Sequence, residues 1–354
     1  MSTPGPTNPP AADSPPASSA PPVRSAPTDI EDAGVNATVE AIAAGDRRAL
    51  ARAITLVEST RADHRTQAVA LLNAIAPIAS AFRVGITGTP GVGKSTFIET
   101  FGLHLVRNHG LKVAVLAVDP SSTRTGGSIL GDKTRMAELA REPHAFIRPT
   151  ASGGTLGGVA RRTREVVRLV EAAGYDVVLV ETVGVGQSET AVANLTDAFV
   201  LLVAPAGGDE LQGVKRGIME LADLVVVNKC DGDLQAQARA TLSEYSSALR
   251  LMRPSSANWT PVAIPASALI GVGVADVWTT LTELRSARAV EQMERRAAQE
   301  RSWLWVEITE RVTDALRADV SVRQLEADVL AGSLSTSSAV EAIVARTSVV
   351  TPHS

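Results

Sequence analysis

Cysteine is almost absent from this sequence, because Cys230 is the only one in 354 residues. A single thiol excludes an intrachain disulfide and a multi-thiolate metal site, and it fits a reducing compartment, so we expect a cytoplasmic protein. No apolar run approaches the ~18 residues that span a bilayer, so we expect no membrane partner. An excess of basic residues is also missing: the formal net charge is −4 and the pI is about 5.8. This charge argues against nucleic acid as the main partner.

The N-terminal segment lacks the composition of a folded region. Nine of the nineteen prolines lie in residues 1–30, interleaved with serine and alanine. The segment also lacks the basic start and apolar stretch of a signal peptide. We therefore expect a disordered tail and not a targeting sequence.

Residues 88–96 read Gly-Thr-Pro-Gly-Val-Gly-Lys-Ser-Thr and match the P-loop pattern G-x-x-x-x-G-K-[ST] in full. A short apolar run precedes this segment, and apolar residues at helical spacing follow it, so an ordinary glycine-rich turn is the weaker alternative. The glycines let successive backbone N–H groups face inward, and the helix N-terminus adds its positive end. We expect Lys94 to reach the β- and γ-phosphates of a nucleotide and Ser95 to bind Mg²⁺. The expected phosphate-binding residues are Gly88, Gly91, Val92, Gly93, Lys94, Ser95 and Thr96.

Short apolar runs alternate with helix-like segments through the middle of the chain. Continuous apolar strands between helices indicate an α/β fold with a doubly wound, mostly parallel sheet of the P-loop NTPase type. The expected strands are 83–87, 112–118, 145–148, 176–180, 198–203, 224–227 and 261–265. We expect a tail (1–30), an N-terminal helical extension (31–80) with helices over 36–59 and 63–78, a P-loop domain (81–288) and a C-terminal helical arm (289–354).

Three carboxylates follow strand ends, where ligands bind in such sheets. A P-loop enzyme needs carboxylates to orient hydrated Mg²⁺, and Asp119 and Asp132 are candidates; each could instead cap a turn or helix. Glu181 ends a buried strand and runs into a glycine-rich turn, which is typical of a Walker B carboxylate before a switch loop. A capped structural carboxylate is the alternative, although an unpaired charge at the end of a buried strand would be costly.

The strand 224–227 is followed by Asn228-Lys-Cys-Asp231, the Asn-Lys-x-Asp signature of guanine recognition. A carboxylate at Asp231 can accept both N1–H and N2–H₂ of guanine, whereas adenine presents an acceptor at N1 and has no 2-amino group. Lys229 would cover the purine face, and Asn228 would brace the loop. Ser267, Ala268 and Leu269 follow the last strand, where a backbone N–H could reach the base. We read Cys230 as a filler residue.

Together these motifs resemble the methylmalonyl-CoA-mutase-associated GTPases, the MeaB/ArgK family, over about residues 37–312. The most specific segments are 119–122, 131–136, 155–163 and 181–189. The resemblance implies a homodimeric GTPase that uses GTP/GDP and Mg²⁺, protects an adenosylcobalamin-dependent mutase and gates delivery of its cofactor. Adenosylcobalamin would sit on the partner and not on this chain. Methylmalonyl-CoA mutase is the family's default partner, and related acyl-CoA mutases stay open.

The resemblance also implies residue roles. Lys94 and Ser95 would bind the phosphates and Mg²⁺, the three carboxylates would surround the metal, and Gln187 would lie in the second switch. The segment 209–215, which ends at Lys215, resembles a further switch that reports nucleotide state to the mutase; its composition alone suggests a surface helix start. Two departures from the family are a looser turn at 150–153 and a longer, proline-rich tail.

Two tryptophans, Trp303 and Trp305, follow a charged helical segment (291–301) and need a covering surface. Packing on the chain's own domain is one reading, and the family resemblance favours a dimer-forming arm.

Two other functions stay open. A metal-insertion GTPase needs thiol or histidine clusters, but the five histidines are scattered and no Cys-x-x-Cys occurs. A metabolite kinase, such as the amino-acid transport kinase that the family's older naming suggests, would need an acceptor pocket and a base.

Overall fold

The computed structural model describes residues 29–59, 61–75, 81–119, 136–151, 156–182, 188–205, 216–254 and 256–346. Its centre is one seven-stranded sheet with the strand order β3-β2-β4-β1-β5-β6-β7, and all neighbouring strands run parallel. The strands are β1 (Phe82–Gly88), β2 (Val113–Asp119), β3 (Ala145–Ala151), β4 (Val177–Thr182), β5 (Ala198–Val203), β6 (Leu224–Val227) and β7 (Val262–Pro265). The expected doubly wound parallel fold is confirmed, and each strand lies within a few residues of its expected place.

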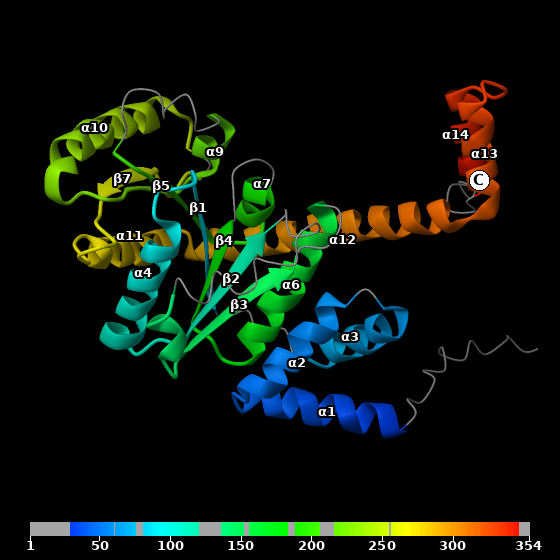
Figure 1. Cartoon of the computed structure of the whole chain (residues 1–354), viewed down its shortest axis with the longest axis horizontal. Coiled ribbons are helices and arrows are strands. Elements are labelled where there is room, and N and C mark those ends of the chain that lie inside the picture. Colours follow the sequence, from blue (N-terminus) through cyan, green and yellow to red (C-terminus); the bar gives the residue numbers. More distant parts are fainter. Residues whose placement is uncertain are drawn as a thin grey trace, which may run out of the picture.

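Helices cover both faces of the sheet (Figure 1). The N-terminal helices are α1 (Asp29–Ala43), α2 (Arg47–Glu58) and α3 (Ala62–Ala74). The helices between strands are α4 (Lys94–His109), α6 (Leu156–Ala172), α7 (Ser188–Ala193), α9 (Arg216–Leu221) and α10 (Gln235–Leu251), with short 3-10 turns η1 (Leu139–Arg141) and η2 (Gly232–Leu234). The C-terminal helices are α11 (Val274–Ala287), α12 (Ala289–Ala318), α13 (Val320–Leu330) and α14 (Thr336–Arg346).

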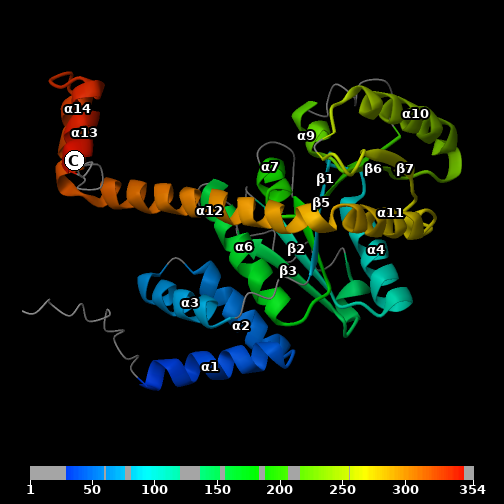
Figure 2. The ribbon, with the colours of Figure 1, turned by 180° about the vertical axis from the view of Figure 1, so that it is seen from behind.

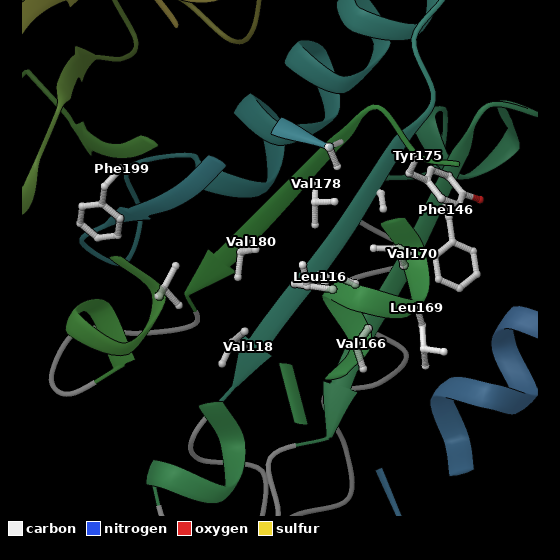
Figure 3. Packing of buried hydrophobic residues seen from close by; sticks show 14 of the residues in the cluster. Leu116, Val118, Phe146, Val166, Leu169, Val170, Tyr175, Val178, Val180 and Phe199 are labelled. Atoms are coloured by element: carbon white, nitrogen blue, oxygen red, sulfur yellow. The ribbon is translucent and has the colours of Figure 1, made fainter. Parts of the chain in front are cut away.

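The central strands are apolar throughout because both of their faces are buried. In β4, Val177 and Leu179 belong to the core shared with α4 and α11, and Val178 and Val180 belong to the core on the opposite face. Figure 3 shows that second core, where strand residues meet α6. The residues labelled there include Leu116, Val118, Val178 and Val180 from the strands and Val166, Leu169 and Val170 from α6.

The N-terminal extension differs from the expected single helix over 36–59. The chain breaks after α1 at Gly45, whose φ of 81° lies in the left-handed region. Asp46 then caps α2, because its carboxylate accepts hydrogen bonds from the backbone N–H groups of Arg48 and Ala49. Apolar spacing continued through this break, so the pattern alone did not reveal it. The second expected helix, 63–78, corresponds to α3, and α1 begins at Asp29, inside the expected tail (1–30).

Helix α12 is fixed to the main domain along its first half and then extends beyond it, with α13 and α14 at its far end (Figure 2). Arg296 forms hydrogen bonds with both carboxylate oxygens of Asp197, at 2.8 and 2.5 Å. Trp303 is only 8% exposed and packs against Leu195 and Ala191. The segment 291–301 is therefore not only the solvated face that its charges suggested. Among the described helices, none is long and apolar enough to cross a membrane.

Candidate functional site

The P-loop lies between the carboxyl end of β1 and the start of α4, as expected for this fold. A Cβ on Gly88 would lie 2.4 Å from the backbone oxygen of Leu202, so β1 approaches β5 too closely for any side chain. Gly93 is the N-cap of α4 and has a φ of 90°; a Cβ there would lie 3.0 Å from Nδ2 of Asn228. These two glycines are thus required by contacts with β5 and with the residue after β6, as well as by the loop's own curvature.

Lys94, the first residue of α4, directs its ammonium group back along the loop. Its Nζ donates hydrogen bonds to the backbone oxygens of Gly88 at 2.7 Å and Thr89 at 3.4 Å. Burial lowers the pKa of Lys94, and the negative charges of Glu181 and Glu189 oppose that shift. The cation is therefore held inside the loop, in the region where P-loop proteins place the β- and γ-phosphates.

Glu181 lies in the interior of this edge of the sheet. It is 4% exposed and stands in register with Ile86 of β1 and Ala117 of β2. Asp119, the last residue of β2, comes two positions after Ala117, so its backbone lies at the same edge. Parallel strands thus bring two of the expected carboxylate positions to the P-loop. Carboxylates at these positions and the half-buried hydroxyl of Ser95 are oxygen donors of the kind that Mg²⁺ prefers.

Asn228 connects the P-loop to the guanine-recognition loop. Its Nδ2 donates to the backbone oxygen of Val92 at 2.9 Å, and its Oδ1 accepts from the backbone N–H of Ala268 at 3.0 Å. Lys229 adds a second connection, because its Nζ donates to the backbone oxygen of Gly91 at 2.7 Å. Lys229 is also the single non-glycine residue with positive φ, 58°, among those described. The predicted bracing role of Asn228 therefore has a direct geometric basis.

Asp231 is oriented by the hydroxyl of Ser267, which donates to its Oδ1 at 2.5 Å. The other carboxylate oxygen of Asp231 would accept hydrogen bonds from a bound base. The backbone N–H of Ser267 is donated to Val272 and that of Ala268 to Asn228, and the expectation that one of them reaches the base stays a prediction. These bonds fix the loop itself. The same role stays a prediction for Leu269, which is 77% exposed.

Sequence reasoning missed two residues that support the site. Thr100, on α4, donates its hydroxyl to the backbone oxygen of Ala268 at 2.8 Å and so fixes the last loop to the P-loop helix. Thr182 donates to the hydroxyl of Thr87 at 2.9 Å, between the strand ends of β4 and β1. Thr100 belongs to no motif, and Thr182 lies in the segment 181–189 without a role assigned to it there, so both contacts are recognisable only when the strands are assembled.

The histidines are less scattered than their sequence positions suggested, because Nε2 of His104 and Nε2 of His109 lie 3.3 Å apart at the end of α4. Within the described ranges, no group of three or more histidine, cysteine, aspartate or glutamate side chains could hold a metal ion. Several expected site positions lie outside the described residues: Asp132, Gln187, Lys215 and the side chain of Asp119.

Comparisons with known proteins agree with this geometry. The family model described as methylmalonyl Co-A mutase-associated GTPase MeaB matches residues 50–321, which include both the P-loop and the guanine-recognition loop. A probable GTPase of Mycobacterium tuberculosis is 53% identical over 321 residues, which cover 89% of this chain and 95% of the relative. The mitochondrial methylmalonic aciduria type A homolog of Mus musculus is 47% identical over 325 residues, covering 87% and 78%. A crystal structure named LAO/AO transport system kinase has a TM-score of 0.71 and 39% identity, and the match covers 88% of this chain and 97% of that one. Because these matches cover most of each chain, they bear on the whole fold and not on the P-loop alone.

Proposed function

The chain belongs to the methylmalonyl-CoA mutase-associated GTPases, and from that premise we propose that it protects an adenosylcobalamin-dependent acyl-CoA mutase and gates its cofactor loading. Methylmalonyl-CoA mutase is the first candidate partner, since the family description carries its name and the murine relative is named for methylmalonic aciduria type A. GTP hydrolysis would time the conformational change. The proposal places the protein in the cytoplasm as a homodimer.

The single observation that carries this proposal is the connection made by Asn228 between the phosphate loop and the base-recognition loop. Because the buried amide of Asn228 contacts both loops, a change in the P-loop can shift the guanine-recognition loop, and a change in that loop can shift the P-loop. Ser95, Asp119 and Glu181, with Asp132, are the residues that would hold Mg²⁺. The ion would neutralise charge on the β- and γ-phosphates.

We expect the isolated protein to hydrolyse GTP slowly. Arg124 and Lys215, the cations that the sequence places on loops at the nucleotide edge, lie outside the described residues. A cation positioned against the γ-phosphate can contribute ~10³-fold or more to hydrolysis. A mutase that positions one of these cations against the γ-phosphate would therefore accelerate turnover.

The test compares GTP turnover with and without the cognate mutase, in the wild type and in a variant combining Lys215→Ala with Gln212→Ala. The expected variant keeps GTP and GDP affinities within about 1 kcal/mol of the wild type but loses mutase stimulation and nucleotide-dependent cofactor loading. Stimulation that survives would assign the coupling to the loop after Glu181. A fast wild-type rate that no mutase changes would contradict the chaperone proposal.

A metabolite kinase is the second candidate, and the name of the similar LAO/AO transport system kinase structure supports it. The two functions differ in the acceptor of the γ-phosphate, which is water for a GTPase and a small molecule for a kinase. Incubation with γ-labelled GTP and basic amino acids distinguishes them. Label found only in inorganic phosphate supports the GTPase, whereas a labelled amino-acid product supports the kinase.

A further inference from the structure

Helix α7 contacts strand β1, which leads into the P-loop, and its end also contacts α12. It contains six residues, so its length is roughly 9 Å. Its first turn carries the buried carboxylate of Glu189, and two backbone carbonyl groups at and after its end accept hydrogen bonds from α12. Figure 2 shows α7 beside α12. A short helix with these contacts at its two ends can carry a displacement from one end to the other.

Glu189 is 3% exposed, and the helix that carries it packs against β1 and β4. Strand β4 carries Glu181, which is also buried. Burial lowers the pKa of Lys94, and the negative charges of Glu181 and then Glu189 oppose that shift. Both carboxylates therefore lie within electrostatic reach of the ammonium group that P-loop proteins place against the phosphates.

The other end of α7 is held by side chains of α12. Arg295 donates to the backbone oxygen of Ala193 at 3.4 Å, and Gln299 donates to that of Thr196 at 3.2 Å. The last carbonyl groups of a helix have no partner within the helix, so these donors cap α7, and the charge of Arg295 suits the negative end of the helix dipole. Trp303, four residues after Gln299, packs on the same part of the chain.

Strand β1 limits the directions in which α7 can move. A Cβ on Gly85 would lie 2.9 Å from Cγ1 of Val192 and 2.9 Å from Oγ1 of Thr196, so α7 and the turn after it already touch the backbone of β1. Gly85 comes three residues before Gly88, the first glycine of the P-loop. Protein interiors are close-packed and compress little. A displacement of α7 is therefore directed away from β1 and changes its contacts with α12.

We propose that α7 couples the P-loop to α12, so that replacing GDP by GTP loosens the contact between the end of α7 and the first half of α12. GTP brings more negative charge to Lys94 than GDP does. This charge attracts the ammonium group of Lys94 and repels the carboxylate of Glu189, which acts as a positioning residue. Each nucleotide then favours a different position of α7 through its differential affinity. The inference goes beyond the proposed chaperone function, because it concerns the isolated chain and needs no mutase.

The first test measures hydrogen exchange in the full-length wild type without a mutase. The protein is saturated with Mg²⁺ and either GDP or a non-hydrolysable GTP analogue. Backbone amides of residues 295–303 should exchange about threefold or more faster with the analogue, because their contact with α7 is weaker. Amides of α13 are the internal control and should not change. Equal or slower exchange of 295–303 with the analogue would overturn the proposal, and so would an equal change in α13, which would indicate altered association.

The second test repeats the measurement on Glu189→Gln, which removes the charge and keeps the shape of the side chain. The two nucleotide states should then differ by less than about 1.5-fold in residues 295–303. A difference that survives at the wild-type size would overturn the proposal, because the charge of Glu189 would not be what moves α7.

A pair of double variants on α12 tests the other end of α7. Arg295→Ala with Gln299→Ala removes both donors, so residues 295–303 should exchange fast in both nucleotide states. Glu300→Ala with Arg301→Ala is the matched control, because Glu300 pairs with Arg164 of α6 and Arg301 is exposed. The control should keep the wild-type difference. A difference that persists in the first variant, or that disappears in the control, would overturn the proposal. If the first variant does not fold, the wild type and Glu189→Gln still decide the outcome.

Discussion

We expect two side chains, Asp231 and Ser267, to determine which nucleotide base the protein binds. The Ser267 hydroxyl holds one carboxylate oxygen of Asp231 at 2.5 Å, which fixes the direction of the other. Replacing Asp231 by asparagine presents an amide where guanine presents donors, so we expect weaker GTP binding, by roughly 1.5–3 kcal/mol for each charged hydrogen bond lost. Xanthosine triphosphate, which has an oxygen in place of the 2-amino group, should bind better. Calorimetry with GTP, xanthosine triphosphate and ATP measures the order.

The wild type is the reference for this prediction. It should bind GTP and GDP and discriminate against ATP by a factor on the order of 10⁴, because adenine would leave the carboxylate facing an acceptor. Ser267→Ala is an intermediate control that keeps the carboxylate but loses its orientation. Equal affinity of the wild type for ATP and GTP would remove Asp231 from its assigned role.

At Gly93 the phosphate loop approaches the base loop closely. An alanine there would be strained by the φ of 90° and would place its Cβ 3.0 Å from Nδ2 of Asn228. Gly110, at the other end of α4, also has a left-handed φ, 65°, but nothing lies within 4 Å of its Cβ position. We expect both alanine variants to lose about 1–2 kcal/mol of stability. Only Gly93→Ala should also lose nucleotide affinity, at least tenfold by calorimetry.

Comparing the two variants separates the effect of backbone strain from the effect of the contact with Asn228. If Gly110→Ala weakened GTP binding as much as Gly93→Ala, the effect would be a general loosening of α4. If Gly93→Ala bound GTP normally, Asn228 could move without loss of nucleotide affinity. The contact between the two loops would then not be required for GTP binding.

At the scale of the element, α12 presents two tryptophans to different surroundings. Trp303 is 8% exposed and packs against Leu195, whereas Trp305 is 64% exposed. Trp303→Ala should lower the free energy of unfolding by about 3–5 kcal/mol, as other buried aromatic truncations do. Trp305→Ala should change the stability of the single chain by less than about 0.5 kcal/mol. Urea unfolding at low protein concentration measures both.

Trp305 also tests the proposed dimer. Exposed Ile308 and Val312 lie three and seven residues further along α12, so they share its face, and burying such apolar surface would favour association. Sedimentation analysis should show a weaker dimer for Trp305→Ala than for the wild type. A dimer of unchanged strength would place the interface elsewhere.

At the scale of the whole molecule, His104 connects stability to pH. Burial, and then the neighbouring charge of His109, lowers the pKa of His104 from its ordinary value of 6.5. The unfolded chain therefore binds this proton more readily than the folded one. The stabilising contribution is present above pH 6.5 and is lost as the pH falls through the lowered folded pKa.

We therefore expect the urea midpoint to fall between about pH 7.5 and about pH 5.5, and to fall less in His104→Gln. His144→Gln, a change at another histidine, should retain the wild-type dependence. An unchanged slope in His104→Gln would show that other groups dominate the pH dependence.

The sequence by itself determined the fold class and the type of ligand. Runs of apolar residues between helices specify a buried parallel sheet, because only a strand covered on both faces is apolar throughout. The P-loop and the Asn-Lys-x-Asp segment are local motifs, so their chemistry is complete within a few residues. Asp231, Asn228, Lys94 and the glycines could be assigned without knowing the packing.

Only the tertiary structure decided what depends on contacts between distant segments. The break at Gly45, the fixing of Ala268 by Thr100 and the different surroundings of Trp303 and Trp305 each involve partners that no local pattern specifies. The same is true of Arg296, which lies in a segment whose charges suggested a solvated helical face but which pairs with Asp197. Burial turns a charge from a solvated group into one that needs a partner, and burial is a property of the assembled chain.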